Sequence, residues 1–345
     1  RFDESSFFTN RDALIAGTFG PERNQLRSPV APPPAQTLKS WPTDGERERL
    51  SELGRAALER GEVASLVLNG GMATRFGGVV KGVVEVLPGQ SFLALKLGDI
   101  ERAPGHTPVF LMNSFATDTD TQAHLRSHSL DSESIHCVTQ GISLRLTHDG
   151  EVFIGENGDP SFYAPGHGDV FSTLGSSPEF RRFVEGGGKA VMVSNVDNLA
   201  ATLEPAVVGA HLDSAAPVTV EVAPKWAGDK GGAPALVDGR VQIVEGFRFP
   251  PDFDQDTIRV FNTNTMTFDV SAFTTEPPLT WYRAEKSVDG ASVVQFERLM
   301  GEATASMDSL YLEVPREGAD GRFMPVKTPA DLDGLRETIR ARLGL

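Results

Sequence analysis

Residues 68–86, LNGGMATRFGGVVKGVVEV, combine small residues and cations in an order that suits the binding of phosphate groups. Gly70 and Gly71 follow an apolar run, and because they lack Cβ atoms they would let backbone N–H groups approach a ligand. Arg75 and Lys81 then supply positive charge where phosphates would lie. Two glycines after a strand are more often only a turn, but the cations that follow at this spacing favour a nucleotide-binding loop.

The loop matches neither of two common phosphate-binding motifs. The sequence has no GxxxxGK[ST], which excludes a P-loop ATPase. It has no GxGxxG either, because the position two after Gly71 is Ala73.

A histidine between two glycines is a second candidate for binding phosphate. His167 lies in PGHGDVF, residues 165–171, directly before a helix that we expect to begin near Asp169. The N-terminus of a helix attracts anions, and a histidine there can donate a hydrogen bond to phosphate. The alternative is a loop histidine whose ring is satisfied by the backbone.

Carboxamide and carboxylate groups follow a later apolar strand, in VSNVDNLAAT at 193–202. Asn195, Asp197 and Asn198 could form only an Asx turn. An aspartate at the carboxyl edge of a strand is, however, also where a Mg²⁺ ion bound to a triphosphate would find an oxygen ligand. Asp197 is therefore the candidate metal ligand.

Two further segments suggest contacts to a sugar or to its phosphate. On a regular strand, Asn262 and Asn264 of FNTNT would face one side and could bind two hydroxyl groups, although an ordinary polar strand face also explains them. Lys327 lies in the apolar context FMPVK, so its ammonium needs a partner, either a substrate or a structural carboxylate. Lys230, which precedes two glycines, is most simply a solvated lysine.

No other cluster of reactive side chains stands out in the sequence. His124 and His128 are four residues apart on an expected helix, but no third metal ligand is evident nearby. Cys137 is the only cysteine, so no internal disulfide can form, which favours a reducing cytoplasm. We recognise no Ser/His/Asp or Cys/His constellation, so we expect a reaction without a covalent enzyme intermediate.

The elements that would position these residues alternate between strands and helices. Strand-sized apolar runs occur at 64–68, 108–114, 189–195 and 217–222, and helix-compatible stretches at 43–60, 91–103, 118–128 and 169–185. This alternation predicts an α/β fold with a Rossmann-like, doubly wound, mixed but mostly parallel sheet. Stretches at 140–158 and 235–249 alternate polar and apolar residues around an Asp-Gly dipeptide, which predicts antiparallel insertions.

The two ends of the chain depart from this alternation. Residues 1–42 are expected to be an N-terminal extension, whose segment PVAPPPAQTLKSWP predicts an extended, proline-rich strap. Residues 43–345 are expected to form the main domain, which ends in a capped amphipathic helix over PADLDGLRETIRARLG.

Composition excludes several classes of protein. The 345 residues carry 32 Lys and Arg against 47 Asp and Glu, a formal net charge of −15, and no basic stripe, so nucleic acid is not an expected partner. The apolar runs are far shorter than the ~20 residues that a membrane-spanning helix needs. A hydrophobic fraction of 39% excludes disorder for the bulk of the chain. The sequence does not indicate an oligomeric state.

Taken in order, these segments resemble the eukaryotic-type UDP-glucose pyrophosphorylases, a family of sugar nucleotidyltransferases. The family's GGxxTxxG loop and the lysine that follows it are similar to residues 70–81, with Ala73 in place of a usual glycine and with the segment around Lys81 shortened to VKG. Further similar segments follow: PVFLMNSFATDTDT at 108–121, Gln140, PGHGDVF, VSNVDNLAAT, KGGAP at 230–234, VEGF at 244–247, FNTNT, and RFMPVKTPADL at 322–332.

The resemblance implies a nucleotide-diphospho-sugar transferase fold and the reversible conversion of UTP and glucose 1-phosphate, a hexose 1-phosphate, to UDP-glucose and pyrophosphate, with Mg²⁺. Arg75 and Lys81 would stabilise the phosphates, and Lys327 would approach the sugar phosphate. The remaining implied roles are uridine binding by Gly70, Gly71, Met112 and Gln140; the phosphate side of the nucleotide site by Gly166 and His167; and sugar binding by Asn195, Gly232, Glu245, Asn262 and Asn264.

Two alternatives stay open. Within the class, the chain could be a UDP-N-acetylhexosamine or broad UDP-sugar pyrophosphorylase. From another class, it could be a nucleotide-sugar binding protein without catalysis, which Ala73 and the short loop before Lys81 would suit. Members of the family usually continue into a C-terminal β-helix, whereas this sequence ends at Leu345, so we expect the catalytic core alone.

Overall fold

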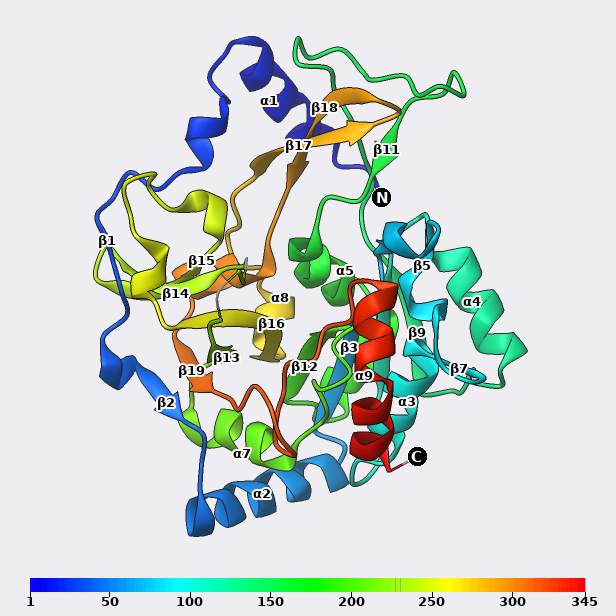
Figure 1. The fold of residues 1–345 in the computed structure, drawn as a ribbon, viewed down its shortest axis with the longest axis vertical. Coiled ribbons are helices and arrows are strands. Elements are labelled where there is room, and N and C mark those ends of the chain that lie inside the picture. The colour runs from blue at the N-terminus through cyan, green and yellow to red at the C-terminus, as the bar shows by residue number, and fades with distance from the viewer. Residues whose placement is uncertain (227, 230, 345) are drawn as a thin grey trace.

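The computed structural model describes residues 1–226, 228–229 and 231–344, which are built around one eight-stranded mixed sheet (Figure 1). Its strand order is β2-β19-β13-β16-β12-β3-β8-β9. The strands are β2 Leu38–Ser40, β19 Ser309–Glu313, β13 Val218–Pro224, β16 Val260–Asp269, β12 Ala190–Asn195, β3 Val63–Leu68, β8 Val109–Asn113 and β9 Ile135–Thr139. Among these strands β16 is antiparallel to both neighbours, and the other pairings are parallel. The predicted mostly parallel sheet is confirmed.

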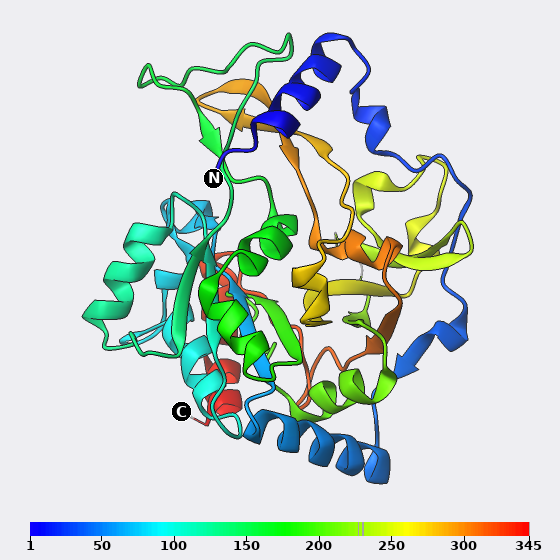
Figure 2. The ribbon, with the colours of Figure 1, turned by 180° about the vertical axis from the view of Figure 1, so that it is seen from behind.

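The sheet is buried on both faces, as its apolar strands require. Along β3, Ala64 and Leu66 belong to one hydrophobic core, and Val63 and Val67 belong to another on the opposite face. Helices α5 (Val170–Gly175), α6 (Pro178–Glu185) and α8 (Ser271–Thr274) supply the first core, as Figure 2 shows. Helices α2 (Asp44–Glu59), α3 (Phe92–Glu101), α4 (Asp118–Ser127), α7 (Pro205–Ser214) and α9 (Pro329–Leu343) supply the second.

The chain reverses its direction of travel across the sheet between β3 and β12. From β3 it moves outward through β8 to β9, and then it returns to place β12 on the other side of β3. Leu68 and Asn195 are register partners, so both strands end at the same edge. This is the switch point at which open α/β sheets bind ligands.

One expected helix is divided into two. The stretch 169–185 forms α5 and α6, because Pro178 disfavours helical backbone at the residue before it and lacks an N–H to continue the first helix. The Ser177 Oγ atom instead accepts a hydrogen bond from the Phe180 N–H and caps α6. At the C-terminus, α9 has the expected cap, with Thr328 and Asp331 forming a reciprocal capping box.

The antiparallel insertions are present but differ in length. β14 (Ala233–Val237) and β15 (Arg240–Val244) form the hairpin expected around Asp238 and Gly239, whose φ angles of 50° and 80° fit a type I′ turn. In the 140–158 region, β10 (Ser143–Leu144) pairs with β11 (Phe162–Tyr163), while Leu146 bridges to Val152. A further hairpin, β17 (Tyr282–Val288) with β18 (Ala291–Glu297), was not foreseen.

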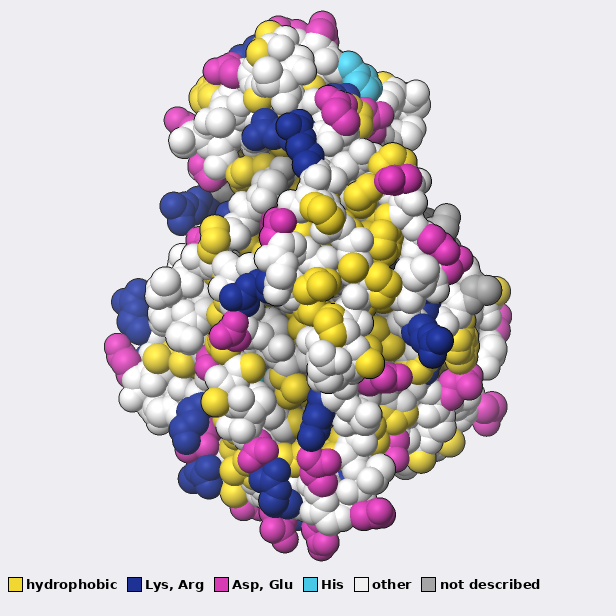
Figure 3. Space-filling view, turned by 90° about the vertical axis from the view of Figure 1, so that its left-hand side faces the viewer, with side chains coloured by type: hydrophobic (Ala, Val, Ile, Leu, Met, Phe, Trp, Pro, Cys, Tyr) yellow, Lys and Arg dark blue, Asp and Glu magenta, His cyan; other side chains and the backbone are white. Residues whose placement is uncertain are grey.

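The N-terminal segment contributes to three parts of the fold. Helix α1 (Glu4–Ile15) packs Phe7 and Leu14 against Val294 and Phe296 of β18. β1 (Val30–Ala31) pairs with β14, and β2 forms the edge of the main sheet. Figure 3 looks onto the side that this segment crosses, where hydrophobic side chains gather in the middle of the face. Across the described residues, no helix has the length and apolarity that crossing a membrane requires.

Candidate active site

The glycine loop leaves β3 at the switch point and folds back as a short hairpin. β4 (Met72–Ala73) pairs with β5 (Val79–Val80), and the Lys81 N–H donates to the Gly71 carbonyl oxygen at 3.2 Å. Arg75 is exposed at the turn of this hairpin. The shortened loop therefore returns Lys81 to the base of the glycine pair and leaves Arg75 free to meet an incoming ligand.

Gly70 lies against Gln140, which follows the end of β9, two strands away from β3 in the sheet. A Cβ atom on Gly70 would lie 2.5 Å from the Gln140 Nε2 atom. Gln140 is 7% exposed, and its Oε1 atom is buried without a hydrogen-bond partner. A buried amide oxygen without a donor has lost its hydration, so it favours a ligand that brings an N–H group to it. This geometry places two of the expected uridine-binding residues together.

Met112, which the family resemblance placed with the uridine, lies beneath the site. It is 2% exposed in the core with Leu66 and Phe110, and its backbone oxygen accepts a hydrogen bond from the Asn69 N–H at 2.9 Å. Asn69 is fully buried and donates to the Asn113 Oδ1 and Thr121 Oγ1 atoms, so it fixes the ends of β3 and β8. Sequence reasoning did not single out Asn69, because a lone asparagine before a glycine reads as part of the turn.

Lys81 and Asp197 meet across the switch point. The Lys81 Nζ atom lies 2.7 Å from the Asp197 Oδ2 atom, and their side chains are 16% and 18% exposed. Asp197 follows β12, so a cation and a carboxylate converge at the ends of adjacent strands. No cluster of three or more possible metal ligands occurs in the described part of the chain. One carboxylate still fits Mg²⁺, which is commonly held by one or two carboxylates together with substrate phosphates.

Three asparagines form a chain beside this pair. The Asn264 Nδ2 atom donates to the Asn195 Oδ1 atom at 3.0 Å, and the Asn264 N–H donates to the Asn262 Oδ1 atom at 3.0 Å. Our expectation of a regular strand was wrong here: Asn264 has φ +60°, and the β13–β16 register shifts between Val220 and Val222. The irregularity re-aims Asn264 toward the end of β12, as bulges beside functional sites often do.

Gly232 and Glu245 are neighbours on the side formed by β14 and β15. A Cβ atom on Gly232 would lie 3.0 Å from the Glu245 Oε1 atom, and the Gly232 carbonyl oxygen accepts from the Asn262 N–H at 2.7 Å. Burial raises the pKa of the Glu245 carboxyl, and nearby Arg248 opposes this rise. The structure thus groups Gly232, Glu245 and Asn262. Lys230, in the same segment, lies outside the described residues.

His167 is held in one tautomer by the backbone. Its Nδ1 atom accepts a hydrogen bond from the Met300 N–H at 3.0 Å, so in the neutral ring the proton is on Nε2, which is then a donor. Burial lowers the pKa of His167 to about 4. Gly166 has φ +93°, and a Cβ atom there would lie 2.6 Å from the Arg298 carbonyl oxygen, so this turn requires glycine.

The Asp169 carboxylate, which the sequence did not single out for this role, joins the His167 segment both to the Gln140 segment and to Arg298. The Asp169 Oδ2 atom accepts from the Gly141 N–H at 3.0 Å, and its Oδ1 atom lies 2.5 Å from the Arg298 Nη2 atom. Arg298 also pairs with Glu276 at 3.1 Å. No local sequence signal reveals this contact, because 129 residues separate Asp169 from Arg298.

Lys327 lies on the segment that closes the site from the C-terminal side. The Val326 N–H donates to the Asp197 carbonyl oxygen at 3.3 Å, so Lys327 comes one residue after a contact with the candidate metal ligand. The expected apolar setting was wrong: Met324 and Val326 are buried, but Lys327 is exposed because the extended chain alternates its side chains. It borders a cavity of about 650 Å³ that Trp226, Phe261 and Asp331 also line.

These features define the class of protein. A doubly wound α/β sheet carries a glycine loop, a lysine–aspartate pair and a buried amide at one switch point, which is the arrangement of a nucleotide-binding α/β protein.

Comparison with known proteins gives the family. The model of the UTP–glucose-1-phosphate uridylyltransferase family matches residues 34–338, and the chain belongs to this family. The chain is 32% identical to the UTP–glucose-1-phosphate uridylyltransferase of Hordeum vulgare over 287 residues, which cover 77% of the chain and 60% of that protein. It is 30% identical to that of Saccharomyces cerevisiae over 326 residues, covering 88% of the chain and 63% of the relative.

A solved structure shows the same fold. The chain resembles the crystal structure of UDP-glucose phosphorylase from Trypanosoma brucei with a TM-score of 0.76 and 27% identity, covering 96% of this chain and 74% of that one. The resemblance seen in the sequence is thus confirmed, as is the nucleotide-diphospho-sugar transferase fold. The chain spans about three fifths of the length of the relatives from Hordeum vulgare and Saccharomyces cerevisiae.

Proposed function

We propose that this chain transfers the uridylyl group of UTP to glucose 1-phosphate, giving UDP-glucose and pyrophosphate in a reversible reaction. The observation that carries the proposal is the Lys81–Asp197 pair, 2.7 Å apart at the switch point, beside the Gly70–Gln140 contact. Membership of the family and the printed names of its relatives support the same reaction.

The reaction is an in-line attack on the α-phosphorus of UTP. An oxygen of the sugar phosphate forms the new P–O bond, and the bond between the α-phosphorus and the bridging oxygen of pyrophosphate breaks. Negative charge accumulates on the pyrophosphate, and the Lys81 ammonium and the Arg75 guanidinium neutralise it. The protein supplies position and charge rather than a nucleophile.

Asp197 would hold a Mg²⁺ ion, which would neutralise phosphate charge when bound. In the free protein the Asp197 carboxylate forms an ion pair with Lys81. This contact already orients the carboxylate toward the region where the phosphates would bind. The neutral His167 ring donates from Nε2, which suits a phosphate oxygen on the nucleotide side. Burial keeps this histidine uncharged at neutral pH, so it acts as a hydrogen-bond donor.

The sugar side is built from the asparagine chain and from the segment around Gly232. Asn264 and Asn195 present amide groups that can bind hydroxyls, and Glu245 presents a carboxylate that can accept from them. Lys327 approaches from the C-terminal segment, and its exposed ammonium would bind the sugar phosphate.

A single cysteine in the sequence supports a reducing location such as the cytoplasm.

The test is a pyrophosphate-release assay of the purified chain. UTP, ATP, dTTP and GTP are each combined with glucose 1-phosphate, galactose 1-phosphate and N-acetylglucosamine 1-phosphate. We expect the highest kcat/KM for UTP with glucose 1-phosphate, the sugar phosphate that the relatives' names give. ATP should be turned over much more slowly, because a base that leaves the buried Gln140 amide unpaired costs about 1–3 kcal/mol. Equal turnover of ATP and UTP would contradict the proposal. Binding of UDP-glucose without turnover would instead show a binding protein.

A further inference from the structure

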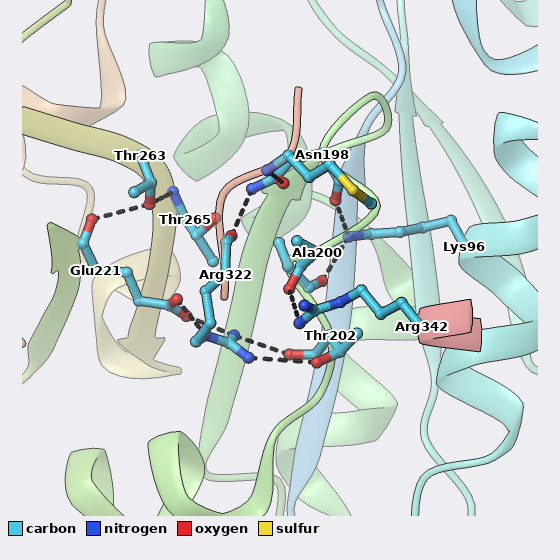
Figure 4. A network of polar contacts seen from close by, with 11 residues as sticks. Lys96, Asn198, Ala200, Thr202, Glu221, Thr263, Thr265, Arg322 and Arg342 are labelled. Atoms are coloured by element: carbon cyan, nitrogen blue, oxygen red, sulfur yellow. Dashed lines mark hydrogen bonds and ion pairs between the residues drawn. The ribbon is translucent and has the colours of Figure 1, made fainter. Parts of the chain in front are cut away.

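Figure 4 shows a buried polar network around the turn that follows β12. It includes two cations, Lys96 on α3 and Arg322 on the segment before Lys327, each 2% exposed. Both reach the turn that follows β12, which carries Asp197. The network therefore connects segments that bear residues of the proposed site without containing any of those residues.

Lys96 is held by two backbone oxygens of that turn. Its Nζ atom donates to the Asn198 carbonyl oxygen at 3.0 Å and to the Ala201 carbonyl oxygen at 2.5 Å. Among the residues described, no carboxylate lies within ion-pair distance of this ammonium. A buried ammonium held only by carbonyls costs desolvation, and burial lowers the pKa of Lys96 to about 8. Lys96 therefore satisfies two carbonyl oxygens of the turn at the cost of burying its charge.

The Asn198 side chain connects the turn that Lys96 binds to the C-terminal segment 322–327. It is 1% exposed, its Nδ2 atom donates to the Arg322 carbonyl oxygen at 3.1 Å, and its Oδ1 atom accepts from the Met324 N–H at 2.9 Å. Asp197 adds a backbone bond from Val326. The turn and the segment 322–327 are thus fixed to each other immediately beside Asp197 and Lys327.

The other buried cation anchors the same segment to the sheet. The Arg322 guanidinium makes two bonds to the Glu221 carboxylate on β13, at 2.5 and 2.8 Å, and a third to the Thr202 carbonyl oxygen at 2.9 Å. The Glu221 carbonyl oxygen accepts from the Thr263 Oγ1 atom on β16, beside the bulge at Asn264. The Lys96 ammonium, in contrast, donates only to backbone oxygens of the turn after β12.

We infer that Lys96 is a positioning residue: by binding the carbonyl oxygens of Asn198 and Ala201, it sets where Asp197 and Lys327 lie relative to Lys81. This inference rests on the proposed function and adds a residue that touches neither substrate. A misplacement of reacting groups by about 1 Å can lower a rate ~100-fold, so loss of the two bonds should affect the rate more than folding.

The test is Lys96→Met, which preserves volume and removes both donors. We expect kcat to fall roughly 10- to 100-fold and KM for glucose 1-phosphate to rise. KM for UTP should change little, because Gly70 and Gln140 follow the ends of β3 and β9 and do not contact the Lys96 turn. The melting temperature should fall by several degrees at most, because the variant relieves the desolvation of a buried charge but leaves two carbonyl oxygens without this donor. Lys96→Gln keeps amide donors and should recover part of kcat.

The matched control is Lys189→Met. Lys189 forms a surface ion pair with Glu62 before the start of β12, at the opposite edge of the sheet, so its loss should leave both KM values and kcat unchanged. Wild-type constants for Lys96→Met would overturn the inference. A loss of activity that only parallels a loss of folded protein, with no recovery in Lys96→Gln, would also overturn it.

Hydrogen exchange separates this inference from the proposed function. In Lys96→Met the amides of residues 196–201 and 322–326 should exchange faster, while those of β3 and β8 keep their protection. If the wild-type chain releases no pyrophosphate, the proposed function has failed, and the exchange result still decides whether Lys96 holds the turn. Unchanged protection in both segments would overturn the positioning role.

Discussion

The ammonium of Lys81 lies 2.7 Å from the carboxylate of Asp197, although 116 residues separate them in the sequence. The contact joins the loop after β3 to the turn after β12, and both side chains are largely shielded from water. Each group is therefore neutralised by the other in the free protein and is directed into the site. In the proposed reaction, Lys81 would turn to the bound phosphates and leave Asp197 to a metal ion.

Replacing Lys81 should chiefly affect the chemical step. Because charge builds on pyrophosphate as its bond breaks, Lys81→Ala should lower kcat by roughly 10²- to 10³-fold, the scale for removing one transition-state donor. The double variant Lys81→Ala/Asp197→Asn should be less than additive, since the two groups interact directly. Steady-state kinetics on the three variants tests this, and strict additivity would show that the contact has no role in turnover.

Activity should require a divalent cation, because Arg75 and Lys81 alone leave a triphosphate incompletely neutralised. Excess EDTA should abolish turnover, and Mg²⁺ should restore it. Asp197→Asn should raise the Mg²⁺ concentration needed for half-maximal activity several-fold, since the amide is a weaker ligand than the carboxylate. Full activity in EDTA, with metal analysis showing no bound ion, would contradict this expectation.

Stability should fall in mild acid partly because of His167. The pKa of this histidine is lowered to about 4 in the folded state, against about 6.5 in the unfolded chain. Between these values the unfolded state binds the extra proton, so the free energy of unfolding decreases as pH falls through the window, by at most about 3 kcal/mol. His167→Gln should flatten this slope in urea unfolding between pH 4.5 and 7.5. His106→Gln, at an exposed histidine, is the control, and an equal slope in both variants would exclude His167 as the cause.

The elements that local sequence patterns specify were predictable. β3, β8 and β12 are continuous apolar runs that end at turns, and α2 shows apolar residues at helical spacing, so each was placed to within a few residues. Residues at the ends of these strands, such as Gly70 and Asp197, could be assigned to one site because parallel strands end at a common edge.

Features that depend on tertiary contacts were not predictable. The positive φ of Asn264 arises from a register shift between β13 and β16, which no local pattern encodes. Lys327 follows apolar residues in the sequence, yet its side chain is exposed. Met324 and Val326 point into the core, and Lys327 does not. The Asp169–Arg298 and Lys96–Asn198 contacts likewise join segments more than 100 residues apart.

Lys327 should contribute to binding of the sugar phosphate. Because its side chain is exposed, Lys327→Ala should leave the free energy of unfolding within about 0.5 kcal/mol of the wild-type value. It should raise KM for glucose 1-phosphate together with any loss in kcat, and KM for UTP should move less. Lys286→Ala, which removes a surface pair with Glu297, is the matched control. Wild-type constants for both substrates would make Lys327 a surface residue only.

Gly70 and Gly71 should respond differently to the same substitution. At Gly70 an added methyl group would lie 2.5 Å from the Gln140 Nε2 atom and 3.4 Å from the Ser114 nitrogen, and Gln140 is too buried to move aside freely. Gly70→Ala should therefore destabilise the fold by about 1–3 kcal/mol. It should also raise KM for UTP at least ~10-fold, because the displaced amide is the group expected to bind uracil.

At Gly71 no atom other than its chain neighbours lies within 4 Å of the added methyl position, and the backbone does not require glycine. Gly71→Ala should keep wild-type stability, so any rise in its KM reports crowding of the ligand itself. Urea unfolding and steady-state kinetics on the pair separate the two effects. If Gly70→Ala binds UTP and discriminates against ATP as the wild type does, Gln140 is not the group that reads the base. The unpartnered Gln140 oxygen would then need a different explanation.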